Sequence, residues 1–188
     1  MWAYVKDGSI VQTNTSQTRL VIRGTEFPAK YANEWTVQQK KDYGVYEVVQ
    51  DNTNLKDGAY YNNGASTYTF ASDTVTLTYA SATAKELDDV TVDGITTLGL
   101  KTQHKATIKS QAHSSLSDTD WYASRKAEAG TAIPGAVSTY RAAVRTKEND
   151  MKTLIGNAAD VDALAALYVY NDDDPRTRPL GEWPESVS

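Results

Sequence analysis

The sequence predicts an α+β protein, with a β-rich first half followed by a helical second half of three to four helices. Two observations support this prediction. Eight of the 12 tyrosines and both phenylalanines precede residue 80, where Gly, Asn and Asp interrupt the chain at short intervals. From Leu100 onward the apolar residues recur instead at helical spacing. We therefore expect a β-rich module over residues 1–95, a helical module over 96–170 and an irregular, acidic, proline-containing tail over 171–188.

The first half is expected to contain strands separated by turn residues. Asp7-Gly8 provides the positive φ angles of a tight turn, so residues 2–5 and 10–13 are expected to form a hairpin. Thr36, with Gln39 three positions later, is typical of a capping box and predicts a short helix ended by Gly44. Further strands are expected at residues 18–22, 45–50, 59–62, 67–71 and 74–80, the last with one buried face because its residues alternate.

The segment between the halves fits two interpretations. Residues 82–87 have a helix-forming composition, whereas Val90-Thr91-Val92 followed by Asp93-Gly94 is typical of a strand and a turn. The sequence does not decide between them. The boundary between the two halves is expected in this segment.

The helical half begins with an amphipathic helix over residues 100–117. An apolar row and a parallel basic row predict it: Leu100, Ile108, Ala112, Leu116 and Lys101, Lys105, Lys109. A second helix over 121–129 is expected to take Ser117 or Asp118 as its cap and to end at Gly130.

A long third helix is expected from Pro134 to about Ile155. Proline suits the first turn of a helix because its missing N–H costs nothing there, and Gly156 is expected to end the helix. The apolar stripe predicted to face a core or a partner consists of Val137, Tyr140, Val144, Met151 and Leu154. A last short helix is expected over 160–168.

Charge is unevenly distributed along the chain. Residues 1–100 carry a net charge of −4, residues 101–152 carry +4 and residues 153–188 carry −5. A basic helical stretch between two acidic ones is expected to pair with its neighbours or with an acidic partner. The pI near 5.0 does not favour nucleic-acid binding, which relies on phosphate neutralisation. The longest apolar run has eight residues, against roughly 20 needed to cross a bilayer, and no leader is visible, so no membrane association is expected.

Candidate reacting groups are few. The chain has no cysteine, no Gly-x-Ser-x-Gly motif and no phosphate-binding glycine motif. His104 and His113 are nine residues apart, so on a helix they point to different faces and are expected at the surface or in capping roles. The acidic run 172–174 is interpreted as a solvated turn rather than a calcium site, and the carboxylates at 88, 89 and 93 as turn residues rather than a catalytic pair. We therefore expect a protein that is not an enzyme, with no cofactor and no metal ion.

A set of short motifs in residues 100–188 carries a family resemblance. Thr119-Asp120-Trp121 is followed by Pro134, then by Tyr140-Arg141 with Arg145 four positions on, and finally by Trp183-Pro184. This order resembles the C-terminal region of bacteriophage tail-fibre assembly proteins and related tail-associated proteins. The family's aromatic residue three positions before the tyrosine is Val137 here, and its short link to Trp-Pro is lengthened by residues 157–174.

The first half is similar to uncharacterised virion proteins of marine tailed phages. The similarity rests on Trp2, on the stretch from Phe27-Pro28 to Trp35-Thr36, and on Gly44-Val45-Tyr46-Glu47-Val48-Val49. Together the resemblances imply a structural protein of the tail, baseplate or tail fibre, made in the host cytoplasm and located in the virion. Its partners would be other tail or fibre proteins in a homo- or hetero-oligomer. The alternatives are a tail-fibre assembly chaperone and a carbohydrate-binding receptor module that uses the tyrosine-rich half.

The motif residues also suggest a local structure. Trp121 and Tyr140 are expected to pack together, while the Asp120 carboxylate accepts hydrogen bonds from Arg141 or from Arg145. In one interpretation these residues only brace a helical hairpin. In the other they contact a partner directly.

Overall fold

The computed structural model describes residues 1–14, 19–27 and 34–187, and it confirms the predicted α+β class. The chain forms two compact units, Met1–Thr83 and Ala84–Ser188. The division therefore lies before the expected boundary near residue 95, because residues 86–89 are tied to the start of the first long helix. Leu100 N–H donates to the Glu86 carbonyl at 2.9 Å, and Lys101 N–H donates to the Leu87 carbonyl at 3.0 Å.

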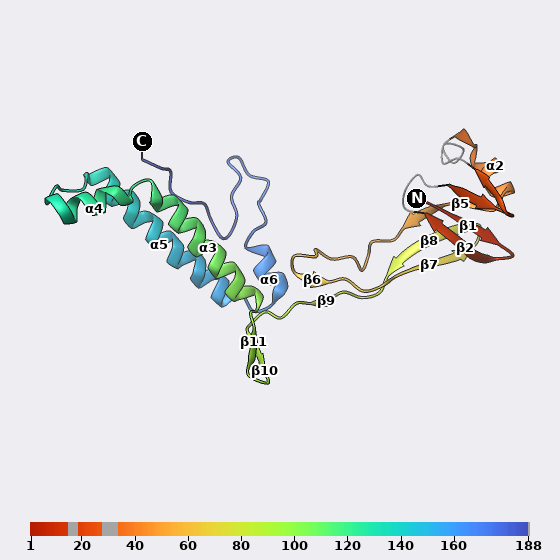
Figure 1. Cartoon of the computed structure of the whole chain (residues 1–188), viewed down its shortest axis with the longest axis horizontal. Helices are drawn as coiled ribbons and strands as arrows, with labels where there is room; N and C mark the ends of the chain where they lie inside the picture. The colour runs from red at the N-terminus through yellow and green to blue at the C-terminus, as the bar shows by residue number, and fades with distance from the viewer. Residues whose placement is uncertain (15–18, 28–33, 188) are drawn as a thin grey trace. The chain divides into compact units, whose positions relative to one another are not determined.

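The first unit is built on a five-stranded sheet in the order β2-β1-β5-β8-β7 (Figure 1). Strands β5 and β8 are parallel, and the β1–β2, β1–β5 and β7–β8 pairs are antiparallel. The strands and the helix of this unit are β1 Trp2–Lys6, β2 Ser9–Asn14, β3 Leu20–Ile22, β4 Thr25–Phe27, α2 Val37–Asp42, β5 Val45–Gln50, β6 Tyr61–Asn62, β7 Ser66–Ala71 and β8 Thr74–Tyr79, with β9 Thr83–Ala84 at the division.

Strand β1 is the centre of this unit because both of its faces are buried. Trp2 and Tyr4 pack with Ile22 and Val45 on one face, whereas Ala3 and Val5 pack with Val75 on the other. Because side chains alternate along a strand, four consecutive apolar residues can fill two separate clusters.

Several local predictions for the first unit are confirmed. The Asp7-Gly8 turn joins β1 to β2 with positive φ at both residues, and Thr36 and Gln39 form a complete capping box at α2. On β8 the alternation buries Val75 and Leu77, as expected. The start of the strand expected at Thr18, and Pro28 in the stretch that carries the resemblance, lie outside the described residues.

The strand expected over residues 59–62 is shorter than predicted. The N–H groups of Tyr60 and Tyr61 both donate to the Asp57 carbonyl, at 3.0 and 2.9 Å, which holds the chain in a turn up to β6.

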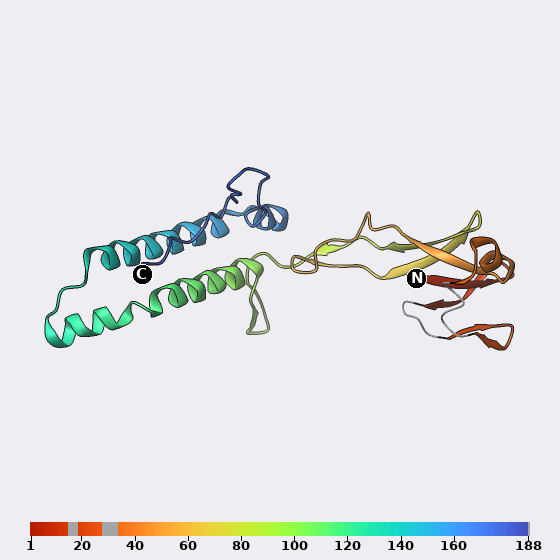
Figure 2. The same ribbon diagram turned by 90° about the horizontal axis from the view of Figure 1, so that it is seen from above.

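The second unit consists of a hairpin and four helices. Their bounds are β10 Val90–Val92, β11 Ile95–Thr97, α3 Leu100–Ser117, α4 Asp120–Ala129, α5 Gly135–Asn157 and α6 Val161–Ala166. Helices α3 and α5 pack side by side, and α4 lies at one end of the pair (Figures 1 and 2). The open question over residues 82–97 is settled in favour of the hairpin, whose turn at Asp93-Gly94 has positive φ at both residues.

Four expectations for the helices are wrong in detail. Pro134 precedes α5 rather than occupying its first turn, and the helix continues through Gly156 to Asn157. Leu154 is 38% exposed, and Ile155, four positions after the buried Met151, completes the apolar stripe instead. Thr119, not Ser117 or Asp118, precedes α4, and its side chain makes no capping bond to that helix.

The segment after α6 is irregular, as expected, but it packs on the helices. Leu180 is 1% exposed, and its N–H donates to the Leu167 carbonyl at 3.0 Å. Trp183 and Val187 pack against the cluster that Tyr140 forms with residues of α3 and α5. Residues 171–187 are therefore part of the second unit rather than a separate tail.

Candidate functional site

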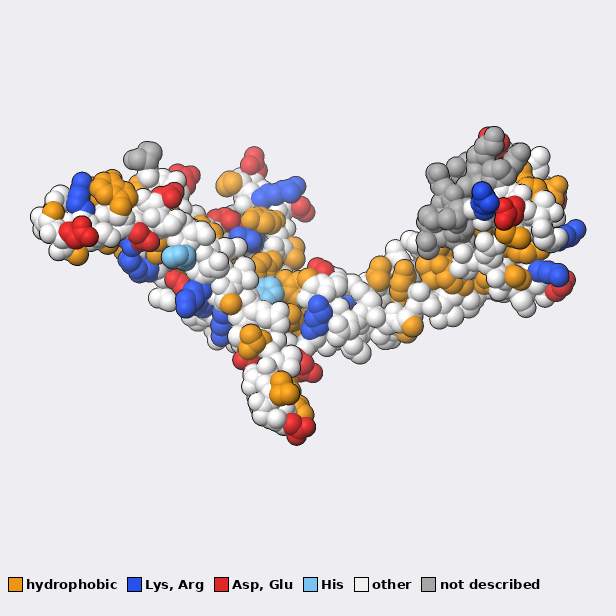
Figure 3. Space-filling view, viewed as in Figure 1, with side chains coloured by type: hydrophobic (Ala, Val, Ile, Leu, Met, Phe, Trp, Pro, Cys, Tyr) orange, Lys and Arg blue, Asp and Glu red, His pale blue; other side chains and the backbone are white. Residues whose placement is uncertain are grey.

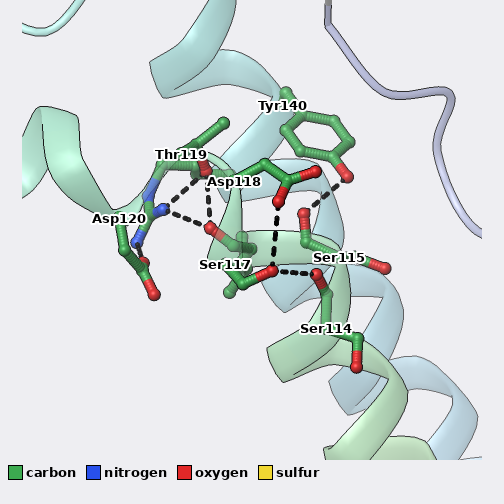
Figure 4. A network of polar contacts seen from close by, with 9 residues as sticks. Ser114, Ser115, Ser117, Asp118, Thr119, Asp120 and Tyr140 are labelled. Carbon is green, nitrogen blue, oxygen red and sulfur yellow. Dashed lines mark hydrogen bonds and ion pairs between the residues drawn. The ribbon is translucent and has the colours of Figure 1, made fainter.

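The motif residues at 119–120 and 140–141 meet where α3 ends and α4 begins (Figure 4). The last four carbonyl groups of a helix have no partner within the helix, so they need donors from elsewhere. Three of these four carbonyls in α3 find one. Ser114 accepts from the Ser117 hydroxyl at 2.7 Å, Ser115 accepts from the Tyr140 hydroxyl at 2.9 Å, and Leu116 accepts from the Thr119 hydroxyl at 2.8 Å.

Arg141 is the charged centre of this site and is only 8% exposed. Its Nη1 donates to the Thr119 hydroxyl at 2.7 Å and to the Leu116 carbonyl at 3.1 Å. Its Nη2 lies 2.8 Å from Oδ1 of Asp120. A cation at the C-terminal end of α3 is also favoured by the helix dipole. The guanidinium therefore joins the end of α3, the start of α4 and the second turn of α5.

Of the two arginines considered as partners of Asp120, the structure selects Arg141. Arg145 is exposed, one turn further along α5, and it forms no ion pair with any residue that the structure describes. Asp120 also lies in the first turn of α4, where a negative charge is favourable.

The expected contact between Trp121 and Tyr140 is not what the structure contains. The Trp121 ring is 50% exposed and stacks on Tyr122, with ring centroids 3.8 Å apart. Tyr140 packs instead with Ala112 and Val144, and the tryptophan at this cluster is Trp183. The predicted tryptophan is wrong because the chain after α6 returns to α3, where Trp183 packs against the Tyr140 cluster and binds Gln111.

Trp183 also lines a shallow groove on α3. Its indole N–H donates to the Gln111 side-chain oxygen at 3.2 Å. The groove measures about 400 Å³, and Ser110, Gln111, Ser114, Ser115, Arg178 and Trp183 line it.

Sequence reasoning missed two parts of this site. The motif predicts no bonds for Thr119, yet this residue is buried and bonded to both Leu116 and Arg141. The backbone carbonyls of α3 carry no sequence signal, since every residue has one. A short Ser-Asp-Thr linker between two helical patterns was the available indication of a helix end needing donors.

The histidines differ in environment. His113 is exposed, whereas His104 is half-buried, and its Nδ1 lies 2.7 Å from the Tyr168 hydroxyl. Burial lowers the pKa of the His104 imidazole below its usual value of 6.5. The surface position expected for His104 is therefore wrong, because the α6 end of the chain covers it.

Two of the candidate carboxylates of the second unit, Asp88 and Asp89, have structural roles. Asp89 Oδ1 accepts from the Gly99 N–H at 2.8 Å, and Asp88 lies 3.2 Å from the Lys101 ammonium, so both fasten the hairpin to α3. Among the described residues, no three His, Cys, Asp or Glu side chains are arranged to hold a metal ion. No helix in the described part of the chain has the length and apolar character needed to cross a membrane.

Comparison with protein-family models, with curated proteins and with solved structures finds no match to this chain.

Proposed function

We propose that this chain is a non-catalytic structural component of a bacteriophage tail, baseplate or tail fibre, and that it works by protein–protein assembly. The tail context rests on the motif order over residues 119–184, which resembles tail-fibre assembly and tail-associated proteins. The assembly role is supported by apolar surface that the second unit leaves exposed.

The observation that carries the assembly role is the apolar face of the β10–β11 hairpin. Val92 pairs with Ile95 across the hairpin, and the two side chains are 63% and 73% exposed. Val90 lies on the same face, because residues two apart in a strand point the same way. On the opposite face the Thr91 and Thr96 hydroxyls are hydrogen-bonded to each other at 2.9 Å.

A two-stranded hairpin with one exposed apolar face is marginally stable by itself in water. In Figure 3 hydrophobic side chains are visible on this hairpin where it projects from the start of α3. Docking of that face onto a protein partner would bury the three apolar side chains and stabilise the hairpin.

Some residues of the motif brace the helices, and another is exposed to a partner. Tyr140 and Arg141 are bonded to the end of α3, so they brace the helix pair. Trp121 keeps half of its surface exposed, so it is available to a partner. The two interpretations of the motif therefore apply to different residues.

Mass spectrometry of purified phage particles tests the proposal. A structural component is expected in the particle at a fixed copy number. A tail-fibre assembly chaperone is the second candidate, because an exposed apolar hairpin equally suits transient binding to folding fibre chains. Absence from purified particles, despite expression during infection, would reject the structural role and support the chaperone.

The carbohydrate-binding alternative has less support in the geometry. Among the described tyrosines of the first unit, Tyr43 is exposed, whereas Tyr4 is buried and the others are half-buried. Tyr43 itself stacks on Trp35, with ring centroids 4.8 Å apart. Saturable binding of the full chain to a glycan array, abolished by Tyr43→Ala, would favour carbohydrate binding over the structural role.

A further inference from the structure

The exposed surface of α4 carries an aromatic and cationic cluster made of Trp121, Tyr122 and Arg125, here called the α4 cluster. The two rings are stacked, and the Arg125 guanidinium carbon lies 4.7 Å from the Trp121 ring centroid and 5.4 Å from that of Tyr122. Tryptophan, tyrosine and arginine are the residues most enriched in the energetic centres of protein interfaces. Hydrophobic and basic side chains are visible together over α4 in Figure 3.

Arg125 lacks the polar partners that its position calls for. Its Nε is buried and has no hydrogen-bond partner among the described residues. Its guanidinium forms no ion pair within the part of the chain that the structure describes, and the one carboxylate in the first turn of α4, Asp120, is paired with Arg141. The neighbouring Lys126 is exposed and adds a second cation. Arginine forms its strongest hydrogen bonds with carboxylates, so the guanidinium beside the exposed indole suits a partner that presents carboxylates.

The same unit carries a surface of opposite charge in residues 171–177, here called the acidic loop. The Asn171 N–H donates to the Thr177 carbonyl, and the Thr177 N–H donates to Oδ1 of Asn171, both at 2.8 Å. These bonds close the loop and leave its three carboxylates exposed on Asp172, Asp173 and Asp174. None of the three forms an ion pair with another described residue, and Arg176 is the loop's one cation.

The α4 cluster and the acidic loop lie at opposite ends of the α3–α5 pair (Figures 1 and 2). Helix α5 has 23 residues, which corresponds to about 35 Å at the usual rise per residue. The two surfaces therefore cannot meet within one unit. A second copy of the chain can bring them together.

We infer that the α4 cluster of one copy binds the acidic loop of a second copy. Carboxylates of the loop supply acceptors to Arg125, and the exposed indole of Trp121 is covered by the loop backbone. Such a contact joins two different surfaces, so repeating it produces rings or filaments rather than closed pairs. This inference deepens the proposed function, on which it rests, by naming the first partner as another copy of this chain.

Sedimentation velocity of the purified full chain at low and high salt tests the inference. We expect species larger than the 20.6 kDa monomer, with association weakened by about tenfold or more in Kd between about 0.05 and 0.5 M salt. Two variants each remove one surface: W121A/R125Q, and D172N/D173N/D174N. Each alone should remain monomeric. An equimolar mixture should form a one-to-one dimer and nothing larger, because it retains one intact contact.

Matched controls remove exposed charge elsewhere on the same unit. R145Q and D150N should associate like the unmodified chain, and circular dichroism should show that every variant is folded. A chain that stays monomeric at all concentrations up to about 100 μM, or an unchanged association of either double or triple variant, would overturn the inference. Incorporation into particles by a chain that is monomeric in solution would reject this contact while leaving the proposed function standing. Self-association of a chain that is absent from the particles would support this contact and reject the proposed function.

Discussion

The guanidinium of Arg141 and the carboxylate of Asp120 meet at 2.8 Å across the junction of three helices. The arginine comes from the second turn of α5 and is buried, whereas the Asp120 side chain remains about half-exposed at the start of α4. Because the same guanidinium also binds the last turn of α3, the pair fixes where α3 ends and where α4 begins.

Replacement of Arg141 by methionine should destabilise the second unit by about 2–3 kcal/mol. The change leaves the Leu116 carbonyl and the Thr119 hydroxyl with fewer partners in a buried site. Urea unfolding followed by helical circular dichroism measures the effect. The matched control is R145M, at an exposed position on the same helix, which should change stability by no more than about 0.5 kcal/mol. Equal effects of the two changes would contradict the role given to Arg141.

The two tryptophans of the motif should respond differently to truncation. W183A should lower the stability of the second unit by about 2 kcal/mol, because the indole packs against the Tyr140 cluster and binds Gln111. W121A should cost about 0.5–1 kcal/mol, since half of its surface is already exposed. Thermal unfolding of both variants measures the difference. A larger loss for W121A would show that this residue braces the fold.

Polar replacement of the hairpin face should reduce assembly without reducing stability. V92T/I95T removes apolar surface that is already exposed, so the free energy of unfolding should change by less than about 0.5 kcal/mol. The copy number of the variant in purified particles, compared with T91V/T96V on the opposite face, measures its effect on assembly. Normal incorporation of V92T/I95T would remove the hairpin from the proposed interface.

The stability of the second unit should fall as the pH is lowered through about 6.5. Burial lowers the pKa of His104, so the unfolded chain binds a proton at a pH where the folded chain does not. The contribution of His104 is therefore complete above pH 6.5 and is lost progressively toward its folded pKa. Melting temperatures between about pH 7.5 and 5.5 should show a slope that H104Q reduces. H113Q, at an exposed site, should keep the slope of the unmodified chain.

Alanine replacement of two glycines in the first unit separates the cost of a positive φ angle from the cost of a steric clash. Gly8 and Gly44 have φ angles of 76° and 74°, but only at Gly44 is there no room for a Cβ, which would lie 2.4 Å from the Val5 carbonyl oxygen. G8A should cost about 1 kcal/mol, and G44A should cost about 3 kcal/mol or more. Chemical denaturation of the first unit, followed by tryptophan fluorescence, measures both. Similar losses would mean that β5 shifts to accept the methyl group.

Local sequence signals account for the parts of the fold that were predicted well. The Asp7-Gly8 turn, the Thr36 capping box and the alternation around Val75 each depend on residues a few positions apart. The bounds of α3 also follow from its own apolar and basic rows. Such features depend on residues that lie close together in the sequence.

The errors arose where distant residues decide the outcome. Glycine is the residue type that most often follows the end of a helix, so the sequence predicts that Gly156 ends α5. A Cβ at this position would lie 3.1 Å from the Lys105 ammonium nitrogen, so the glycine makes room for a side chain of α3. The partner of Tyr140 is Trp183 rather than Trp121 because the chain turns back after α6. The role of Thr119 depends on Arg141, 22 residues later. None of these relationships has a local pattern.

The dependence of α3 on α5 sets an order for folding during translation. The Tyr140 hydroxyl that caps Ser115 lies 25 residues further along the chain, and the Arg141 guanidinium follows it. While the ribosome has released α3 but still holds residue 140, the last turn of α3 has donors only from residues 117–119, and we expect that turn to fray. The helix acquires its final length when α5 emerges, so the nascent second unit matures late and as a whole.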